Sequence, residues 1–243
     1  MENILNKQIG ELVAQDYRTA AIFNAHGIDF CCRGNRKVND VCDLKKINKQ
    51  QLENQLQQVF TEKTTGEPDF RAWPLDLLAD YIEKTHHRYV SEKSPVLQQF
   101  LTKLCKVHGE RHPELFTIHE AFNDLAKELA SHMKKEELIL FPFIRKMINH
   151  KITHQPLEKP HFGSVENPIN MMEHEHTEAG ELLQVIEKNT NGYTPPADAC
   201  NTYRVTFAML KEFEEDLHKH IHLENNILFP KAIALEKEQD VAV

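Results

Sequence analysis

Apolar residues recur every three or four positions in four long stretches of the chain from residue 73 onward. That spacing is typical of amphipathic helices, because it places the apolar side chains on one face. Proline- and glycine-containing stretches at residues 155–168 and 189–196 interrupt the pattern. The connection at residues 92–112 has a weaker pattern, consistent with a short helix. The pattern predicts four long helices, at residues 74–91, 113–149, 170–189 and 198–236.

The first sixty residues are organised differently. Short helical patterns there surround a loop at residues 26–34, which reads HGIDFCCRG, and a further helix is expected at residues 47–60. The polar run at residues 61–68 contains glycine and proline and is typical of a linker. We therefore expect two domains, a small helical domain at residues 1–65 and a helical bundle at residues 66–243.

An internal repeat relates the second and fourth predicted long helices. Residues 132–142 read HMKKEELILFP and residues 220–230 read HIHLENNILFP, so the pattern recurs after 88 residues. Two related helical hairpins that pack together form a four-helix bundle. The predicted fold is therefore all-α, an up-down four-helix bundle preceded by a small helical N-terminal domain.

Two polar pairs interrupt the apolar stripes of the repeated helices. His132 and Glu136 fill the gap in one stripe, and His220 and Glu224 fill the gap in the other. Residues four apart on a helix lie on the same face. A buried imidazole and a buried carboxylate are costly unless their polar atoms are satisfied. A metal ion bound inside the bundle would satisfy all four groups at once.

The other two long helices each supply one histidine to the same interior. The stripe of Leu78 and Ile82 continues to His86, whereas His87 is expected on the polar face. In the third helix the stripe passes through His176, and His174 falls on the polar face. His222 in the fourth helix is also expected on a polar face. The predicted metal ligands are His86, His132, Glu136, His176, His220 and Glu224.

Four imidazoles and two carboxylates suit a pair of iron or manganese ions. Glu136 and Glu224 are expected to bridge the two metals, with two histidines on each metal. This arrangement leaves positions for an oxo or hydroxo bridge and for a small diatomic ligand. A structural zinc site would more often use cysteines and close at four ligands.

Composition and charge narrow the function further. The formal net charge of −8 and the pI near 6.0 argue against a nucleic-acid-binding surface. No stretch approaches the ~18 apolar residues of a membrane helix, and the N-terminus shows no signal peptide, so we expect a cytoplasmic protein. The five cysteines match no disulfide framework. The chain has 15 histidines, which supplies many candidate metal ligands. It has only 8 glycines, which favours helices over a turn-rich β fold.

Three segments resemble those of hemerythrin-like domains: HMKKEELILFP, MEHEHTEAGEL at residues 172–182, and HIHLENNILFP. The loop HGIDFCC resembles the small cysteine-bearing domain of bacterial di-iron proteins that repair iron–sulfur clusters. That resemblance implies repair of clusters damaged by nitrosative or oxidative stress, through iron supply and through binding or reduction of nitric oxide. It implies the same six ligands to two iron ions. Damaged iron–sulfur proteins and nitric oxide or dioxygen would be the partners, and neither nucleic acid nor membrane would be one.

The vicinal cysteines Cys31 and Cys32 have two interpretations. They are two partly buried thiols, or they act in redox chemistry or in metal or nitric oxide transfer, which the resemblance favours. Where the family loop often continues Cys-Cys-Gly-Gly, this chain has Arg33 after Cys32, and a nearby cation lowers a thiol pKa. The alternative function is a hemerythrin-like module that binds or senses oxygen or nitric oxide without turnover. The sequence also leaves open whether the protein reduces nitric oxide and whether it assembles as a homodimer.

Overall fold

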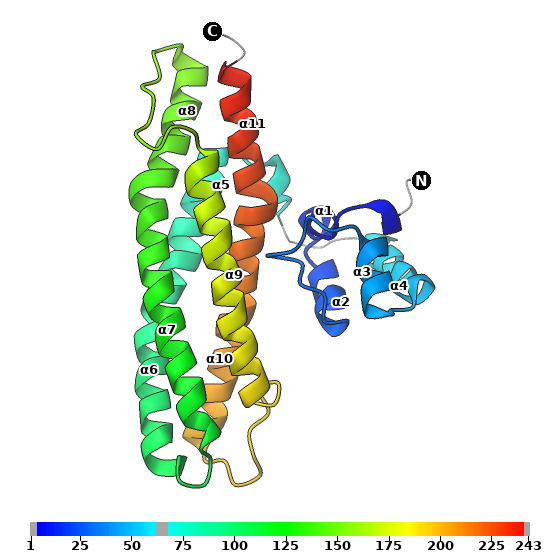
Figure 1. Cartoon of the computed structure of the whole chain (residues 1–243), viewed down its shortest axis with the longest axis vertical. Helices are drawn as coiled ribbons and strands as arrows, with labels where there is room; N and C mark the ends of the chain where they lie inside the picture. Colours follow the sequence, from blue (N-terminus) through cyan, green and yellow to red (C-terminus); the bar gives the residue numbers. More distant parts are fainter. Residues whose placement is uncertain (1–3, 62–67, 241–243) are drawn as a thin grey trace. The chain divides into compact units, whose positions relative to one another are not determined.

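The computed structural model describes residues 4–61 and 68–240, and its regular structure is helical (Figure 1). No β-strand forms within these two ranges, where one isolated bridge joins Gln8 and Lys37. The predicted all-α class is therefore confirmed. No helix in the same ranges is both long and apolar enough to span a bilayer. The predicted domain boundary between residues 65 and 66 lies outside the described residues, as does most of the predicted linker.

The chain forms two compact units, and one of them is built from two separate stretches of the sequence. One is Ala79–His220, and the other combines Met1–Leu78 with Ile221–Val243. The fourth long helical run therefore begins in one unit and ends in the other.

The unit Ala79–His220 contains four helical runs that alternate in direction (Figure 1). The runs are α5 (Leu75–Tyr81) through η3 (Ile82–His87) into α6 (Arg88–His108), α7 (Glu114–Lys135) through η4 (Glu136–Leu140) into α8 (Phe141–Thr153), α9 (Glu166–Asn189), and α10 (Asn201–Leu223). This is the up-down bundle that the repeat predicts.

Apolar side chains fill the interior of this bundle, as the periodic pattern predicts. Phe122 of α7 and Phe213 of α10 are 0% and 1% exposed, and their rings meet edge to face with centroids 5.3 Å apart. Aromatic pairs of this geometry add to the stabilisation from burial. The two hairpins are thus joined through a packed aromatic core.

The first long helix extends well beyond its predicted end. The prediction of a helix end at residue 91 is wrong, because α6 continues to His108 and carries Pro95 inside it. Proline usually ends a helix because it cannot donate a backbone hydrogen bond. Here the helix buries Leu97, Leu101 and Leu104 beyond the proline, and this burial offsets the lost bond.

The second unit contains the N-terminal helices and the end of the fourth helical run. Its elements are η1 (Ile4–Asn6), α1 (Ile9–Gln15), α2 (Thr19–Ala25), α3 (Val38–Lys45), α4 (Lys49–Thr61), η2 (Phe70–Ala72), η5 (Glu224–Leu228) and α11 (Phe229–Asp240), with the first turn of α5. Ile9, Phe23, Val38 and Leu52 come from four different helices, and all are 0% exposed.

Asn226 of η5 holds the N-terminal segment through close backbone contacts. Its side-chain amide donates to the carbonyl oxygen of Phe30 at 3.3 Å. A Cβ atom at Gly10 would lie 2.0 Å from the Asn226 Oδ1 atom, and one at Gly34 would lie 2.6 Å from it. A side chain at Gly10 would displace this amide, and one at Gly34 would also lie 2.5 Å from the backbone oxygen of Phe30, so glycine suits both positions.

His222 is buried in the same unit, so the prediction that it lies on an exposed polar face is wrong. It is 2% exposed, and its ring lies 5.6 Å from that of Tyr17 and 6.1 Å from that of Phe30. Helical periodicity cannot reveal this contact, because the covering residues lie some 200 positions earlier in the chain.

Candidate metal centre

Three of the four helical runs contain a π-helical turn at the predicted ligands. The turn η3 ends at His87, η4 begins at Glu136, and η5 begins at Glu224. A π-helical turn inserts an extra residue, so it rotates the positions that follow it relative to a regular α-helix. Such turns occur frequently at functional sites.

Five of the six predicted ligands, all except His86, converge with His87 into two overlapping groups of buried side chains. In one, His87, Glu136, His220 and Glu224 place ligand atoms within 4.8 Å of one another. In the other, His132 and His176 join Glu136 and Glu224 within the same distance. Glu224 stands one helical turn after His220 in the same unbroken helical run, so the helix itself carries its carboxylate there.

Short polar distances mark the centre of both groups. The Oε2 atom of Glu136 lies 3.3 Å from the Nε2 atom of His87 and 3.3 Å from that of His132. The Nε2 atoms of His132 and His176 are 3.1 Å apart. All members of the two groups are at most 2% exposed. Nitrogen donors around two shared carboxylates fit a pair of borderline divalent cations, which would satisfy these buried atoms.

Carboxylates outside the two groups orient the histidine rings. The Nδ1 atom of His87 lies 2.8 Å from Glu137 Oε1, and that of His132 lies 2.9 Å from Glu175 Oε2. A ring that donates from Nδ1 to a carboxylate keeps its Nε2 lone pair directed at the centre. Such bonds fix the ring orientation and raise the basicity of a metal-binding histidine.

Glu175 has a strongly acidic carboxyl group. The hydrogen bond from His132 is the main cause, and together with an ion pair to Lys135 it lowers the pKa of Glu175 to about 2, against the opposing effect of burial. The carboxylate is therefore ionised at neutral pH and available to hold the ring.

Both histidines of the η3 turn are buried, so the prediction that His87 lies on the exposed polar face is wrong. Each is 2% exposed. His86 bonds through Nδ1 to Asp216 Oδ1 at 2.9 Å and stacks on the ring of His220, whereas His87 is the one grouped with Glu136. The physical reason is the π-helical turn, which replaces the spacing of four from Ile82 to His86 by a spacing of five to His87.

The same effect moves a core position in the second run. Regular helical spacing after His132 and Glu136 places Ile139 in the apolar stripe, but Ile139 is 38% exposed, whereas Leu140 is 1% exposed. The η4 turn between Glu136 and Leu140 adds the extra residue.

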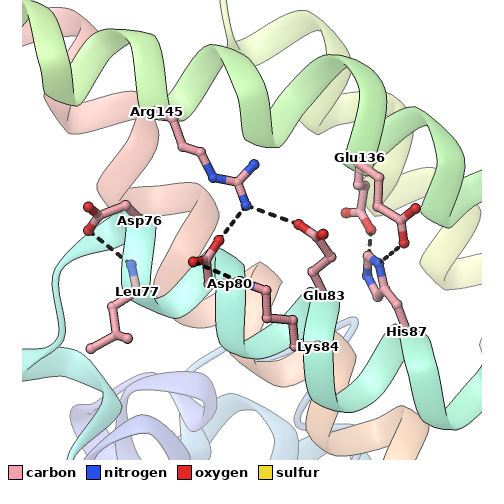
Figure 2. Close-up of polar contacts among 9 residues, drawn as sticks. Asp76, Leu77, Asp80, Glu83, Lys84, His87, Glu136 and Arg145 are labelled. Atoms are coloured by element: carbon pink, nitrogen blue, oxygen red, sulfur yellow. Dashed lines mark hydrogen bonds and ion pairs between the residues drawn. The ribbon is translucent and has the colours of Figure 1, made fainter.

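Arg145 braces the η3 turn against α8. Its Nη2 atom donates to Asp80 Oδ1 at 2.6 Å and to Glu83 Oε2 at 3.0 Å, as Figure 2 shows beside His87 and Glu136. One guanidinium thereby ties two carboxylates, one before and one within the π-helical turn, to a neighbouring helix. This contact holds the turn that carries His87.

A small cavity of about 140 Å³ opens between α7 and α9. His132 and His176 form part of its wall, and Glu128, Lys135, Glu175 and Glu178 line the remainder with other residues. The cavity therefore lies directly against two histidines of one group.

Cys31 and Cys32 lie in the loop between α2 and α3. Their Sγ atoms are 3.8 Å apart, and Asp29 lies beside both residues. Cys31 is 6% exposed and Cys32 is half-buried. Both belong to the unit that contains the N-terminal helices.

Comparison with known proteins gives the family. Residues 78–232 match the Hemerythrin HHE cation binding domain, and residues 5–59 match the Domain of Unknown function DUF542. The chain is 35% identical over 231 residues to an iron–sulfur cluster repair protein YtfE of Escherichia coli O157:H7, covering 95% of this chain and 98% of the relative. The chain belongs to the YtfE family. Relatives of the same name in Musicola paradisiaca and Citrobacter koseri are 35% and 34% identical, and cover 93% and 95% of this chain.

The hemerythrin match spans both groups of buried side chains. The predicted resemblance to this YtfE-type family is confirmed, and a cation-binding domain accounts for these groups better than a purely structural core. The DUF542 match contains the loop with Cys31 and Cys32.

Sequence reasoning missed two residues that shape the site, Asp216 and Arg145. A signal for Asp216 exists, because it lies four positions before His220 just as Glu128 lies four positions before His132. The 88-residue repeat therefore extends one turn further than the predicted motif. Arg145 gives no such signal, because its two partners lie more than sixty positions earlier in the chain.

Proposed function

We propose that this chain holds two iron ions and repairs damaged iron–sulfur clusters by supplying iron. The observation that carries this proposal is the sharing of Glu136 and Glu224 by both groups of buried side chains. Two carboxylates common to two sets of histidines are what a bridged pair of metal ions requires. The relatives named iron–sulfur cluster repair protein support the assignment of repair.

Glu136 and Glu224 would be shared by the two metal ions, His132 and His176 would hold one of them, and His220 would hold the other. For the remaining histidine the sequence favours His86, whereas the grouping of ligand atoms favours His87. We propose His87 as the ligand and His86 as a neighbour that orients the site through Asp216. When bound, the metal pair would supply redox chemistry and would bind a small ligand.

The protein's own contribution is to hold and to release cations. Glu137 and Glu175 fix the rings of His87 and His132, so these rings need not reorient when iron binds. The cavity beside His132 and His176 gives a route for the cation that is donated. In this proposal the protein is cytoplasmic, Cys31 and Cys32 take part in the transfer, and damaged iron–sulfur proteins are the recipients.

An iron-transfer assay tests this function. Reduced, iron-loaded protein is mixed with an apo iron–sulfur enzyme, and the return of enzyme activity is followed over time. Activity should return with the intact chain and fail with a His132→Leu variant. The matched control is His174→Leu, because His174 is exposed and outside both groups. If the recipient gains no activity from the intact chain, the proposed repair function is wrong.

A second candidate function is the binding of nitric oxide or dioxygen without turnover. The cavity favours it, because about 140 Å³ is ample for a diatomic molecule. Nitric oxide added to the reduced protein distinguishes the candidates: a carrier forms a stable, reversible adduct and transfers no iron. Formation of nitrous oxide would instead indicate reductase activity.

A further inference from the structure

The loop that joins α2 to α3 brings three potential ligand atoms together, separate from the histidine and glutamate groups. Asp29, Cys31 and Cys32 each offer one atom, and these atoms lie within 4.8 Å of one another. The Cys31 Sγ atom lies 3.8 Å from the Cys32 Sγ atom and 3.4 Å from Asp29 Oδ1. Two sulfur atoms and one carboxylate oxygen thus lie close enough together to share one cation.

The backbone of this loop is already held in place without a bound ion. Asp29 Oδ1 accepts hydrogen bonds from the backbone N–H groups of Cys31 at 3.1 Å and Cys32 at 3.0 Å. The side-chain amide of Asn225 donates to the Cys31 carbonyl oxygen at 3.2 Å, and that of Asn226 donates to the Phe30 carbonyl oxygen. A ligand set that is ordered in advance loses little entropy when an ion binds.

The donor types at this point suit a thiophilic cation. Two thiolates and a carboxylate would repel one another in so small a space. A divalent ion bound between them offsets this repulsion, because it binds the deprotonated forms of both sulfur atoms.

We propose that Asp29, Cys31 and Cys32 bind one thiophilic divalent cation of the Fe²⁺ or Zn²⁺ class. Two sulfur donors and one oxygen donor leave one position of a tetrahedral site open for an exchanging ligand. Binding releases one proton from each thiol, so the two thiols and the ion give a dithiolate complex and two protons. This site does not depend on the proposed repair function, although a cation that exchanges here would serve it.

The experiment titrates the full-length protein with Co²⁺ and follows the near-ultraviolet absorption band that sulfur–cobalt bonds produce. The histidine and glutamate groups contain no sulfur, so they give no such band. Cys42, Cys105 and Cys200 are also free thiols, so the cysteine variants assign the band. We expect saturation at one Co²⁺ per chain and loss of the band in Cys31→Ser and Cys32→Ser. Cys200→Ser is the matched control, because Cys200 is exposed and lies in the other unit.

Asp29→Asn separates ligation from a role in folding. The asparagine side chain keeps an oxygen that can accept both backbone hydrogen bonds but loses the negative charge, so we expect Co²⁺ affinity to fall about tenfold or more while the fold is kept. Unchanged affinity would show that Asp29 only shapes the loop and would overturn the proposed ligand set. A band that survives in Cys31→Ser and Cys32→Ser, or no band at all, would overturn the site itself. His132→Leu should retain the band even if it loses iron transfer.

Discussion

Replacing His87 with leucine removes an imidazole whose Nε2 atom lies 3.3 Å from Glu136 Oε2 at the centre of one group. Replacing His86 with leucine removes a ring that bonds to Asp216 instead. Loss of a residue that only orients a ligand typically lowers metal affinity 10- to 100-fold. Loss of a ligand itself should exceed that range, so we expect His87→Leu to cost more than about 100-fold, or about 2.8 kcal/mol. His86→Leu should cost about tenfold.

The assay equilibrates each purified variant with Fe²⁺ and a chelator of known affinity, and then measures the iron retained per chain. Helical content by circular dichroism confirms that each variant is folded. The reasoning would be refuted if His86→Leu emptied the site while His87→Leu retained its iron. In that case the binding of metal would draw His86 inward, and the η3 turn would not define the ligand.

Three further predictions follow from other parts of the bundle. Glu175→Gln should lower iron affinity about tenfold, measured in the same chelator assay, because it weakens the hydrogen bond to His132. Phe122→Ala should reduce the free energy of unfolding by about 3–5 kcal/mol in urea titrations, because it opens a cavity in the core. Burial raises the pKa of Glu214 to about 7 from 4.5, so the folded chain keeps a proton that the unfolded chain releases. Stability should therefore fall as the pH rises from about 4.5 to about 7, and Glu214→Gln should flatten this dependence.

Each of these has a result that would contradict it. Unchanged iron affinity in Glu175→Gln would show that the contact with His132 does not support binding. A loss below about 1 kcal/mol in Phe122→Ala would mean that the core collapses around the missing ring. Parallel stability curves for the intact chain and Glu214→Gln across this pH range would show that Glu214 titrates normally.

Much of the bundle could be predicted from the sequence because its signals are local. The spacing of apolar residues sets the helical faces, and the repeat of His132 and Glu136 in His220 and Glu224 sets the pairing of the hairpins. The structure brings these four residues together with His176. Periodicity identified the buried faces of α7 and α9, where the helix keeps a regular pitch.

The errors at the site have one physical origin. A π-helical turn changes the helical pitch, and the residue types in η3 and η4 do not predict such a turn. The exposed position of Ile139 and the burial of His87 both follow from that change. The burial of His222 has a different cause, since Tyr17 and Phe30 cover it from a distant part of the chain.

The metal content and optical spectrum of the purified full-length protein test the central claim most directly. The account predicts two irons per chain and the absorption of an oxo-bridged di-iron centre, which changes on addition of nitric oxide. One iron per chain, or zinc without that absorption, would contradict a centre in which Glu136 and Glu224 are shared between two metal ions.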